Sequence, residues 1–238
     1  MRSGVAFAML LSGLAWAQTA VNMGQEPHYS LLLQNSLVRV FKLALNANEQ
    51  AYVIHTHNFL VVALDDCEVV MWREGTSDNQ SYPLHQGDVR FFFGGQPIGT
   101  RNNRADPCRN VTVEFLDPKV TTYGYQWEYG TWDFGISGIS PPVDSHVKFA
   151  NSLQLGSAVA TDVQLLPGDS FSPHPGTAAE LLVPVTDVAL TRSKKGEIRK
   201  SAGEAVWVEA KQKADVVNAG NAPAQLIAVE FPSNKAAK

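Results

Sequence analysis

Short apolar runs recur along the chain, and turn-forming residues separate them. The runs are rich in Val, Phe and Leu, whereas Asp, Gly, Asn and Pro lie between them. They cover residues 38–45, 59–64, 89–93, 111–115, 181–185, 205–208 and 226–231. No segment has the sustained apolar stripe and capping residues of an amphipathic helix. Many short strands at regular spacing predict an all-β fold built as a sandwich or barrel.

The second half of the chain repeats landmarks of the first half. Gly87 and Gly203 each begin a predicted strand, and Asn102 and Asn218 follow them at the same separation. The same register also matches Pro107 with Pro223 and the Val-Glu-Phe sequence of residues 113–115 with that of residues 229–231. Because several identities share one gapless register, we predict two related all-β domains.

Proline and aromatic residues mark the predicted seam between the domains. We place an N-terminal barrel at residues 18–118, an aromatic and proline-rich linker at 119–148 and a C-terminal barrel at 149–238. The linker aromatics are Tyr123, Tyr125, Trp127, Tyr129, Trp132 and Phe134. Such rings either stack on a flat ligand or cover the groove between the barrels. We favour the second role, because aromatic side chains dominate interface burial.

The first residues have the three-part pattern of a secretory signal peptide. Arg2 supplies a positive start, residues 5–14 are mostly apolar, and residues 15–17 (Ala-Trp-Ala) form a cleavage site. The apolar stretch is too short to span a membrane, and no later stretch is apolar enough to do so. We therefore expect a signal peptide at residues 1–17 and a secreted or periplasmic mature chain without a membrane anchor.

Two cysteines fit an oxidising compartment. Cys67 and Cys108 each lie at a turn before a predicted strand. An even pair in an exported protein predicts a disulfide bond between them. The alternative is two free buried thiols, because spacing alone does not show that the sulfur atoms meet.

Composition and charge narrow the class of partner. The chain has 45% hydrophobic and 18% charged residues, which are ordinary values for a soluble globular protein. Its formal net charge is -4, and it has no dense basic run that could neutralise phosphates. We therefore expect no nucleic-acid partner.

Histidine motifs in both halves lead to a family resemblance. Residues 52–57 read Tyr-Val-Ile-His-Thr-His, and residues 168–180 place a Gly, a His and a Glu at the spacing of the first cupin motif. The repeated glycine and asparagine landmarks match the second cupin motif. Over nearly all of its mature length, the chain therefore resembles exported bacterial bicupins. This resemblance implies two tandem jelly-roll β-barrels, and in cupins two His and a Glu of motif one and a His of motif two hold a divalent metal.

The first half keeps part of the implied metal site. His55 and His57 lie at positions i and i+2, so they would face the same side of a strand. The Glu position falls on Val61 or Val62, and the His position of motif two falls on Ile98. Val and Ile cannot bind a metal. We therefore expect His55 and His57 to hold either one weakly bound divalent ion (Zn, Mn, Ni or Fe) or no metal.

The second half keeps a different part of the site. His174 and Glu180 match motif one, but Gly176 replaces the second His, and Ala214 replaces the His of motif two. Again, only part of the ligand set remains. We therefore expect His174 and Glu180 to have a structural role rather than to hold a metal.

Matching strands rather than histidines gives a second alignment of the two halves. In this alignment Phe59 corresponds to Glu180, His55 takes the second-His position, and His57 becomes an extra residue. Neither alignment restores a full ligand set, and the sequence alone leaves both open.

These observations favour an exported bicupin with incomplete metal sites that binds a small molecule or has a structural role. A barrel mouth is concave, and concave cavities are the default sites for ligands. The alternative is a metal-dependent cupin enzyme, an oxygenase or isomerase, that uses the His55 and His57 pair. The resemblance implies this enzyme class, whereas the missing ligands argue against it.

Overall fold

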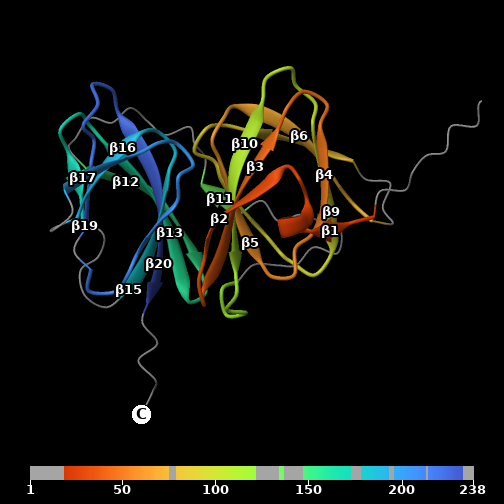
Figure 1. Ribbon diagram of the computed structural model, residues 1–238, viewed down its shortest axis with the longest axis horizontal. Helices are drawn as coiled ribbons and strands as arrows, with labels where there is room; N and C mark the ends of the chain where they lie inside the picture. The colour runs from red at the N-terminus through yellow and green to blue at the C-terminus, as the bar shows by residue number, and fades with distance from the viewer. Residues whose placement is uncertain are drawn as a thin grey trace, which may run out of the picture.

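Strands form nearly all of the regular structure, as the pattern of apolar runs predicts (Figure 1). The computed structural model describes residues 19–74, 79–121, 134–136, 147–172, 178–192, 196–212 and 214–232. Among these residues, the single helix is a turn of 3-10 helix at Met23–Gln25, and no helix is long and apolar enough to cross a membrane. The predicted signal peptide, residues 1–17, lies outside the described residues.

Two sheets form the first barrel. Its strands are β1 (Val21–Asn22), β2 (Tyr29–Gln34), β3 (Val38–Leu45), β4 (Gln50–Ile54), β5 (Phe59–Ala63), β6 (Cys67–Arg73), β7 (Gln80–Leu84), β8 (Val89–Phe92), β9 (Pro97–Asn102), β10 (Cys108–Phe115) and β11 (Phe134–Ile136). One sheet has five strands in the order β1-β4-β9-β6-β7, and the other has six in the order β11-β8-β5-β10-β3-β2. β11 comes from the expected linker and pairs antiparallel with β8.

Two further sheets form the second barrel. Its strands are β12 (Val147–Leu155), β13 (Ala158–Leu165), β14 (Ser170–Phe171), β15 (Ala178–Pro184), β16 (Val188–Arg192), β17 (Gly196–Lys200), β18 (Val206–Val208), β19 (Ala214–Val217) and β20 (Ala224–Pro232). The sheet orders are β12-β13-β20-β15-β18 and β14-β19-β16-β17. The prediction of two all-β units in tandem is confirmed.

Strand β5, in the middle of the six-stranded sheet of the first barrel, is covered on both faces. Phe59 and Val61 of β5 line the interior of the barrel, whereas Leu60 and Val62 point to the opposite face and pack against the second barrel. Alternate residues of a strand face opposite sides of a sheet. Because both sides of β5 are covered, its apolar run (Phe-Leu-Val-Val-Ala) is continuous and does not alternate with polar residues.

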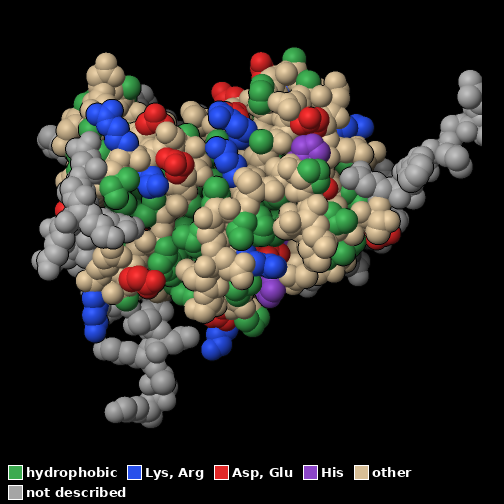
Figure 2. Space-filling model, viewed as in Figure 1, with side chains coloured by type: hydrophobic (Ala, Val, Ile, Leu, Met, Phe, Trp, Pro, Cys, Tyr) green, Lys and Arg blue, Asp and Glu red, His purple; other side chains and the backbone are tan. Residues whose placement is uncertain are grey.

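One hydrophobic core joins the two barrels. It contains residues of β3, β5, β8 and β10 from the first barrel and of β13, β15 and β20 from the second. The rings of Phe115 and Phe231 lie 6.1 Å apart across this junction. Figure 1 shows the two sheets side by side in the middle of the molecule, and Figure 2 shows hydrophobic side chains on the surface between the two lobes. The linker aromatics that we expected to seal this core lie outside the described residues, apart from the backbone of Phe134.

The predicted repeat is visible in two buried asparagines. The side-chain amide of Asn102 donates to two carbonyl oxygens, at 3.1 and 2.8 Å, and its oxygen accepts from a backbone N–H at 2.8 Å. Asn218 makes the same three bonds, at 3.0, 2.7 and 3.0 Å. The partners are Leu45, Asp106 and Arg104 for Asn102, and Leu165, Ala222 and Gly220 for Asn218. The two asparagines therefore close equivalent loops before β10 and β20.

Gly87 and Gly203 bring the two barrels into contact. Both have positive φ angles, 85° and 79°. A Cβ atom at Gly87 would lie 2.5 Å from the side chain of Gln225, and one at Gly203 would lie 2.6 Å from Cδ1 of Leu64. A side chain at either position would therefore strain the backbone and crowd the opposite barrel.

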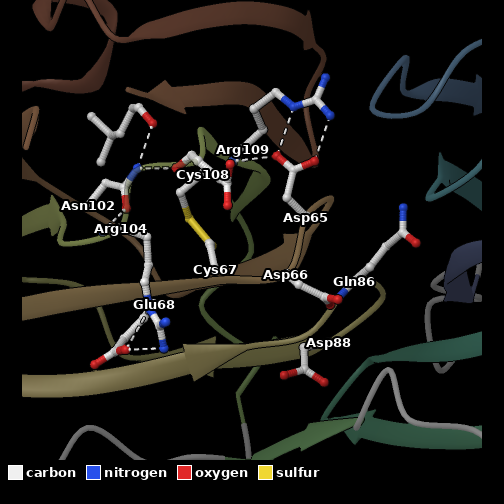
Figure 3. The surroundings of a disulfide bond; sticks show 12 residues. Asp65, Asp66, Cys67, Glu68, Gln86, Asp88, Asn102, Arg104, Cys108 and Arg109 are labelled. Atoms are coloured by element: carbon white, nitrogen blue, oxygen red, sulfur yellow. Dashed lines mark hydrogen bonds and ion pairs between the residues drawn. A yellow bond between two sulfur atoms is a disulfide. The ribbon is translucent and has the colours of Figure 1, made fainter. Parts of the chain in front are cut away.

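The predicted disulfide bond between Cys67 and Cys108 is confirmed. The sulfur atoms lie 2.04 Å apart and the Cα atoms 5.5 Å apart, so the bond joins the first residues of β6 and β10. Figure 3 shows two ion pairs beside it, Asp65 with Arg109 and Glu68 with Arg104. The disulfide therefore ties together the two sheets of the first barrel.

Candidate functional site

A small cavity lies between the two sheets of the first barrel. Its volume is about 30 Å³. Phe59, Phe92 and Ile98 form part of its apolar wall, and His55 and Thr112 contribute polar groups. A cavity of this volume has room for about two water molecules.

His55 lies directly after β4, and its side chain lines the cavity. The residue is 2% exposed, and its ring stacks on Phe59 with centroids 3.7 Å apart and 11° between the ring planes. Its Nδ1 atom has no hydrogen-bond partner among the described residues. Burial, together with the positive charge of Arg39, lowers the pKa of His55 to about 3. The imidazole is therefore neutral near pH 7 and keeps one buried nitrogen unpaired.

A buried ion pair supports the segment that carries His55. Glu114 of β10 is fully buried and pairs with Arg39 of β3. Glu114 Oε1 accepts a hydrogen bond from the backbone N–H of Thr56 at 3.1 Å, and the Thr56 hydroxyl accepts one from Arg39 Nη2 at 3.1 Å. Arg39 Nε is buried without a partner among the described residues. Because a buried carboxylate needs such partners, this network fixes the segment after β4.

Strand β10 supplies buried polar residues on the interior side of the first barrel. Asn110, Thr112 and Glu114 are buried at every second position, on the face turned towards the first barrel's interior. The Thr112 hydroxyl donates to Asn110 Oδ1 at 3.0 Å and also bonds the hydroxyl of Tyr29, whose pKa is raised by burial. Polar residues at alternate positions of an apolar run indicate a strand with one polar face, so the signal was present in the sequence.

The structure separates the two histidines of the first motif. β4 ends at Ile54, so His55 and His57 lie beyond the strand, contrary to our expectation. His57 is half-buried, its Nδ1 atom bonds the Thr56 hydroxyl at 2.9 Å, and it is not among the residues that line the cavity. The expectation fails because side chains at i and i+2 share a face only within a strand. Metal binding by these residues stays a prediction.

Strand pairing decides between the two alignments of the halves. Phe59 pairs with Glu114 in the first barrel, and Glu180 pairs with Glu230 at the equivalent position of the second. The strand-matched alignment therefore holds. Phe59 occupies the Glu position of the cupin motif, and His55 occupies the second-His position.

The groups around the cavity do not fit a tightly bound divalent metal. Of the positions that hold the metal in cupins, the first barrel keeps His55, whereas Phe59 and Ile98 occupy two others. Among the described residues, no group of three or more His, Cys, Asp or Glu side chains could hold a metal ion. A tight site requires three or more protein ligands, and one neutral imidazole does not meet that requirement.

The interior of the second barrel is filled differently. Leu182, Leu226 and Ala228 belong to an apolar cluster that packs between its two sheets. Among the described residues, a cavity of about 10 Å³ lies against this cluster. Glu180 is buried at 3% exposure, whereas His174 lies outside the described residues, so the structural role expected for this pair stays a prediction.

Comparison with known proteins identifies the fold. No family model matches the chain, and neither does any curated protein. The chain is similar to a cupin 2 conserved barrel domain protein from Leptotrichia buccalis, with a TM-score of 0.56, 11% identity and coverage of 85% of this chain and 88% of that one. It is also similar to an oxalate decarboxylase from Lactobacillus farciminis, with a TM-score of 0.56, 12% identity and coverage of 83% of this chain and 78% of that one. Vicilin from Capsicum annuum is similar as well, with a TM-score of 0.60, 8% identity and coverage of 84% of this chain and 77% of that one.

These similarities establish that the chain has the cupin fold in two tandem copies, as the resemblance of its motifs implied. An oxalate decarboxylase and a vicilin share this fold with the chain. The fold therefore does not decide the function, which has to be argued from the site.

Proposed function

We propose that this protein is an exported small-molecule-binding bicupin and that the first barrel is its binding half. The observation that carries the proposal is the contrast between the two interiors. The cavity between the sheets of the first barrel has His55, Asn110 and Thr112 among its lining residues, whereas the described residues at the matching positions of the second barrel belong to an apolar cluster. A cavity with apolar walls and a few polar groups is the usual form of a ligand site.

The state of His55 favours binding over acid–base catalysis. A general base works best when its pKa lies near the working pH. Burial holds the pKa of His55 at about 3, so its neutral ring is a weak base near pH 7. A neutral, buried imidazole is instead suited to a directional hydrogen bond with a bound molecule.

Export is supported by the N-terminal signal pattern and is consistent with the disulfide bond between Cys67 and Cys108. Disulfide bonds persist in oxidising compartments and are rare in the cytosol. Fractionation of cells that produce the full-length chain tests this part of the proposal. We expect the protein in the periplasm or medium, with residues 1–17 removed.

A thermal-unfolding screen against a library of small molecules tests the binding function. Val61 lines the first cavity, and Leu182 is its counterpart in the second barrel. A Val61→Leu variant therefore adds a methylene to a cavity of about 30 Å³. A Leu182→Met variant conserves volume and serves as the control.

We expect at least one compound that raises the melting temperature of the wild type and of Leu182→Met but not of Val61→Leu. Bound ligand stabilises the native state in proportion to the logarithm of its concentration over Kd. Compounds that raise the melting temperature of all three proteins equally bind outside the first cavity. The proposal would be contradicted if no compound in the library raised the melting temperature of the wild type and Leu182→Met without also raising that of Val61→Leu.

A further inference from the structure

A groove lies at one end of the four-stranded sheet of the second barrel. It is lined by the start of β16, the end of β17 and the loop after β19, and its volume is about 290 Å³. This volume is close to the lower end of the roughly 300–1,000 Å³ of ligand pockets. We propose that the groove binds a small organic monocarboxylate, which pairs with the ammonium group of Lys200. The site shares no residue with the cavity of the first barrel.

A small residue in the loop after β19 helps to leave the groove open. In the first barrel, Arg104 extends over the sheet and pairs with Glu68 at 2.7 Å (Figure 3). Gly220 corresponds to Arg104, because each residue donates its backbone N–H to the side-chain oxygen of the repeated asparagine. Gly220 lines the groove and has no side chain to extend across it.

The other partner of that ion pair is also replaced by a small residue. Asp66 and Asp187 each accept a hydrogen bond from a backbone N–H of the loop before β8 or β18, at 2.8 and 3.1 Å, so the two aspartates are equivalent. Glu68 and Ala189 lie two positions after them. Ala189 lines the groove, so the space that an ion pair covers in the first barrel stays accessible in the second.

Lys200 supplies a cation to this space. It pairs with Val188 of β16, and both residues line the groove and also the small cavity beside the apolar cluster. The wall of that cavity is apolar throughout, so Lys200 contributes methylene groups to it. Because a lysine covers apolar surface with its stem and keeps its charged end in water, we place the ammonium group in the groove. Among the described residues, Lys200 is half-buried and its side chain has no hydrogen-bond or ion-pair partner.

The charges around the groove favour a monoanion. Asp187 and Glu204 each accept a hydrogen bond from a backbone N–H of the loop before β18, at 3.1 and 2.7 Å, and neither forms an ion pair with Lys200. The described groove wall has two cations, Arg199 and Lys200, and one carboxylate, Asp187. A ligand with one negative charge balances this wall, whereas Asp187 would repel the second charge of a phosphate.

The rest of the wall favours a carboxylate with a short alkyl chain. Val188, Ala189 and Ala219 have apolar side chains against which a chain can bury its methylene groups. The hydroxyl group of Ser201 has no hydrogen-bond partner among the described residues, so it is a second donor for the carboxylate. Hydrogen bonds between ionised partners are stronger than those between neutral ones, so Lys200 should dominate recognition.

The test compares pentanoate, hexylammonium and 1-hexanol, which have the same number of non-hydrogen atoms but different charges. Each is titrated near neutral pH into the whole protein labelled with 15N, and the backbone N–H signals of Ser201, Ala219 and Gly220 report on the groove. We expect pentanoate to shift these signals saturably, with a Kd on the order of 1 mM. We expect 1-hexanol to bind at least about tenfold more weakly and hexylammonium to cause no saturable shift.

Three variants assign the effect to the charge of Lys200. Lys200→Met keeps an apolar stem but removes the ammonium group, so we expect about tenfold weaker binding of pentanoate. Lys200→Arg keeps the positive charge and should bind within about threefold of the wild type. Lys119→Met removes an exposed lysine elsewhere, and we expect it to bind pentanoate as the wild type does.

Four results would overturn the proposal. Preferred binding of hexylammonium would overturn the anionic class, and equal binding of 1-hexanol and pentanoate would overturn the requirement for charge. Equal binding by Lys200→Met would overturn the role of Lys200. If pentanoate caused no saturable shift at Ser201, Ala219 and Gly220, the groove would not be its site. Binding by the first barrel would stand in all four cases, because the library screen tests it separately.

Discussion

Equivalent strands of the two barrels turn different side chains inward. β10 places Asn110 and Thr112 in the first interior, whereas β20 places Leu226 and Ala228 at the matching positions of the second. Both strands then carry the same Glu, two residues further along. At these two positions the described residues of the first interior are therefore polar, and those of the second are aliphatic.

The features that the barrels share do not involve the interiors. The repeated asparagines bind backbone groups of loops, and the repeated glycines allow close contact between the barrels. These interactions set the path of the chain and the junction, so each interior is free to differ. The scaffold therefore persists in both halves although the site does not.

The largest expected effect concerns the core that the two barrels share. Phe115 is 1% exposed and packs near Phe91 and Phe231. Phe115→Ala should lower the free energy of unfolding by about 3–5 kcal/mol, as other large-to-small core changes do. If the barrels form one cooperative unit, β5 and β15 should lose hydrogen-exchange protection together in rising urea.

Leu31→Ala serves as the control for this experiment. Leu31 is 54% exposed, so its removal should change the free energy of unfolding by no more than about 0.5 kcal/mol. Loss of protection in β5 while β15 stays protected would show that the two barrels unfold independently.

The next effect concerns a link that the first barrel alone possesses. Replacing Cys67 and Cys108 together with alanine opens a covalent loop with a sequence separation of 41. In the chain-entropy account this should lower the free energy of unfolding by about 4 kcal/mol. Urea denaturation of the double variant measures it. A loss below about 1 kcal/mol would mean that neighbouring ion pairs and packing already hold β6 to β10.

The sequence predicted the fold well because the fold depends on local patterns. The apolar runs, the repeated Gly87 and Gly203, and the cysteine pair all mark short strands and their turns, which a one-dimensional pattern records. The site was harder to predict. The spacing of His55 and His57 predicts one strand for both, but β4 ends at Ile54.

Arg39 and Glu114 show a second reason for the difference. They are 75 positions apart in the sequence, and their ion pair exists only because β3 and β10 are neighbours in the sheet. Strand pairing over such distances cannot be read from periodicity. It also settled that Phe59 corresponds to Glu180, which the sequence left open.

A smaller effect arises from His55, which is buried in the first barrel and makes the stability of the protein depend on pH. The pKa of His55 is about 3 in the folded protein and near its ordinary value of 6.5 when unfolded. The unfolded state therefore binds the proton first as pH falls, and stability is lost between about pH 6.5 and pH 3. We expect a loss of about 2 kcal/mol between about pH 6.5 and pH 4.5 from this residue.

Urea denaturation across this pH range should show that loss in the wild type but a correspondingly flatter dependence in His55→Phe. His85→Gln retains His55 and should keep the slope of the wild type. Parallel slopes in the wild type and His55→Phe would mean that other groups govern the acid response.

The smallest expected effect is metal binding by the natural protein. His55 offers one imidazole, and Phe59 and Ile98 stand where cupins have two further ligands. A divalent ion bound there would keep nearly its full charge beside apolar side chains, and burying an uncompensated charge costs free energy. Calorimetric titration with Zn²⁺, Mn²⁺ and Ni²⁺ should therefore give a Kd weaker than about 1 μM, and His55→Ala should remove any binding in the first barrel.

A rebuilt site sharpens this expectation. Phe59→Glu places a carboxylate at the position that the strand-matched alignment assigns to the Glu of motif one, and Ile98→His places a second imidazole at the His position of motif two. With His55, the variant has the three protein ligands that a zinc site requires, so Zn²⁺ should bind at least about 100-fold more tightly than to the wild type. Tight Zn²⁺ binding by the wild type would instead reveal a ligand outside the cupin positions, and the metal-dependent enzyme would become the better account of the first barrel.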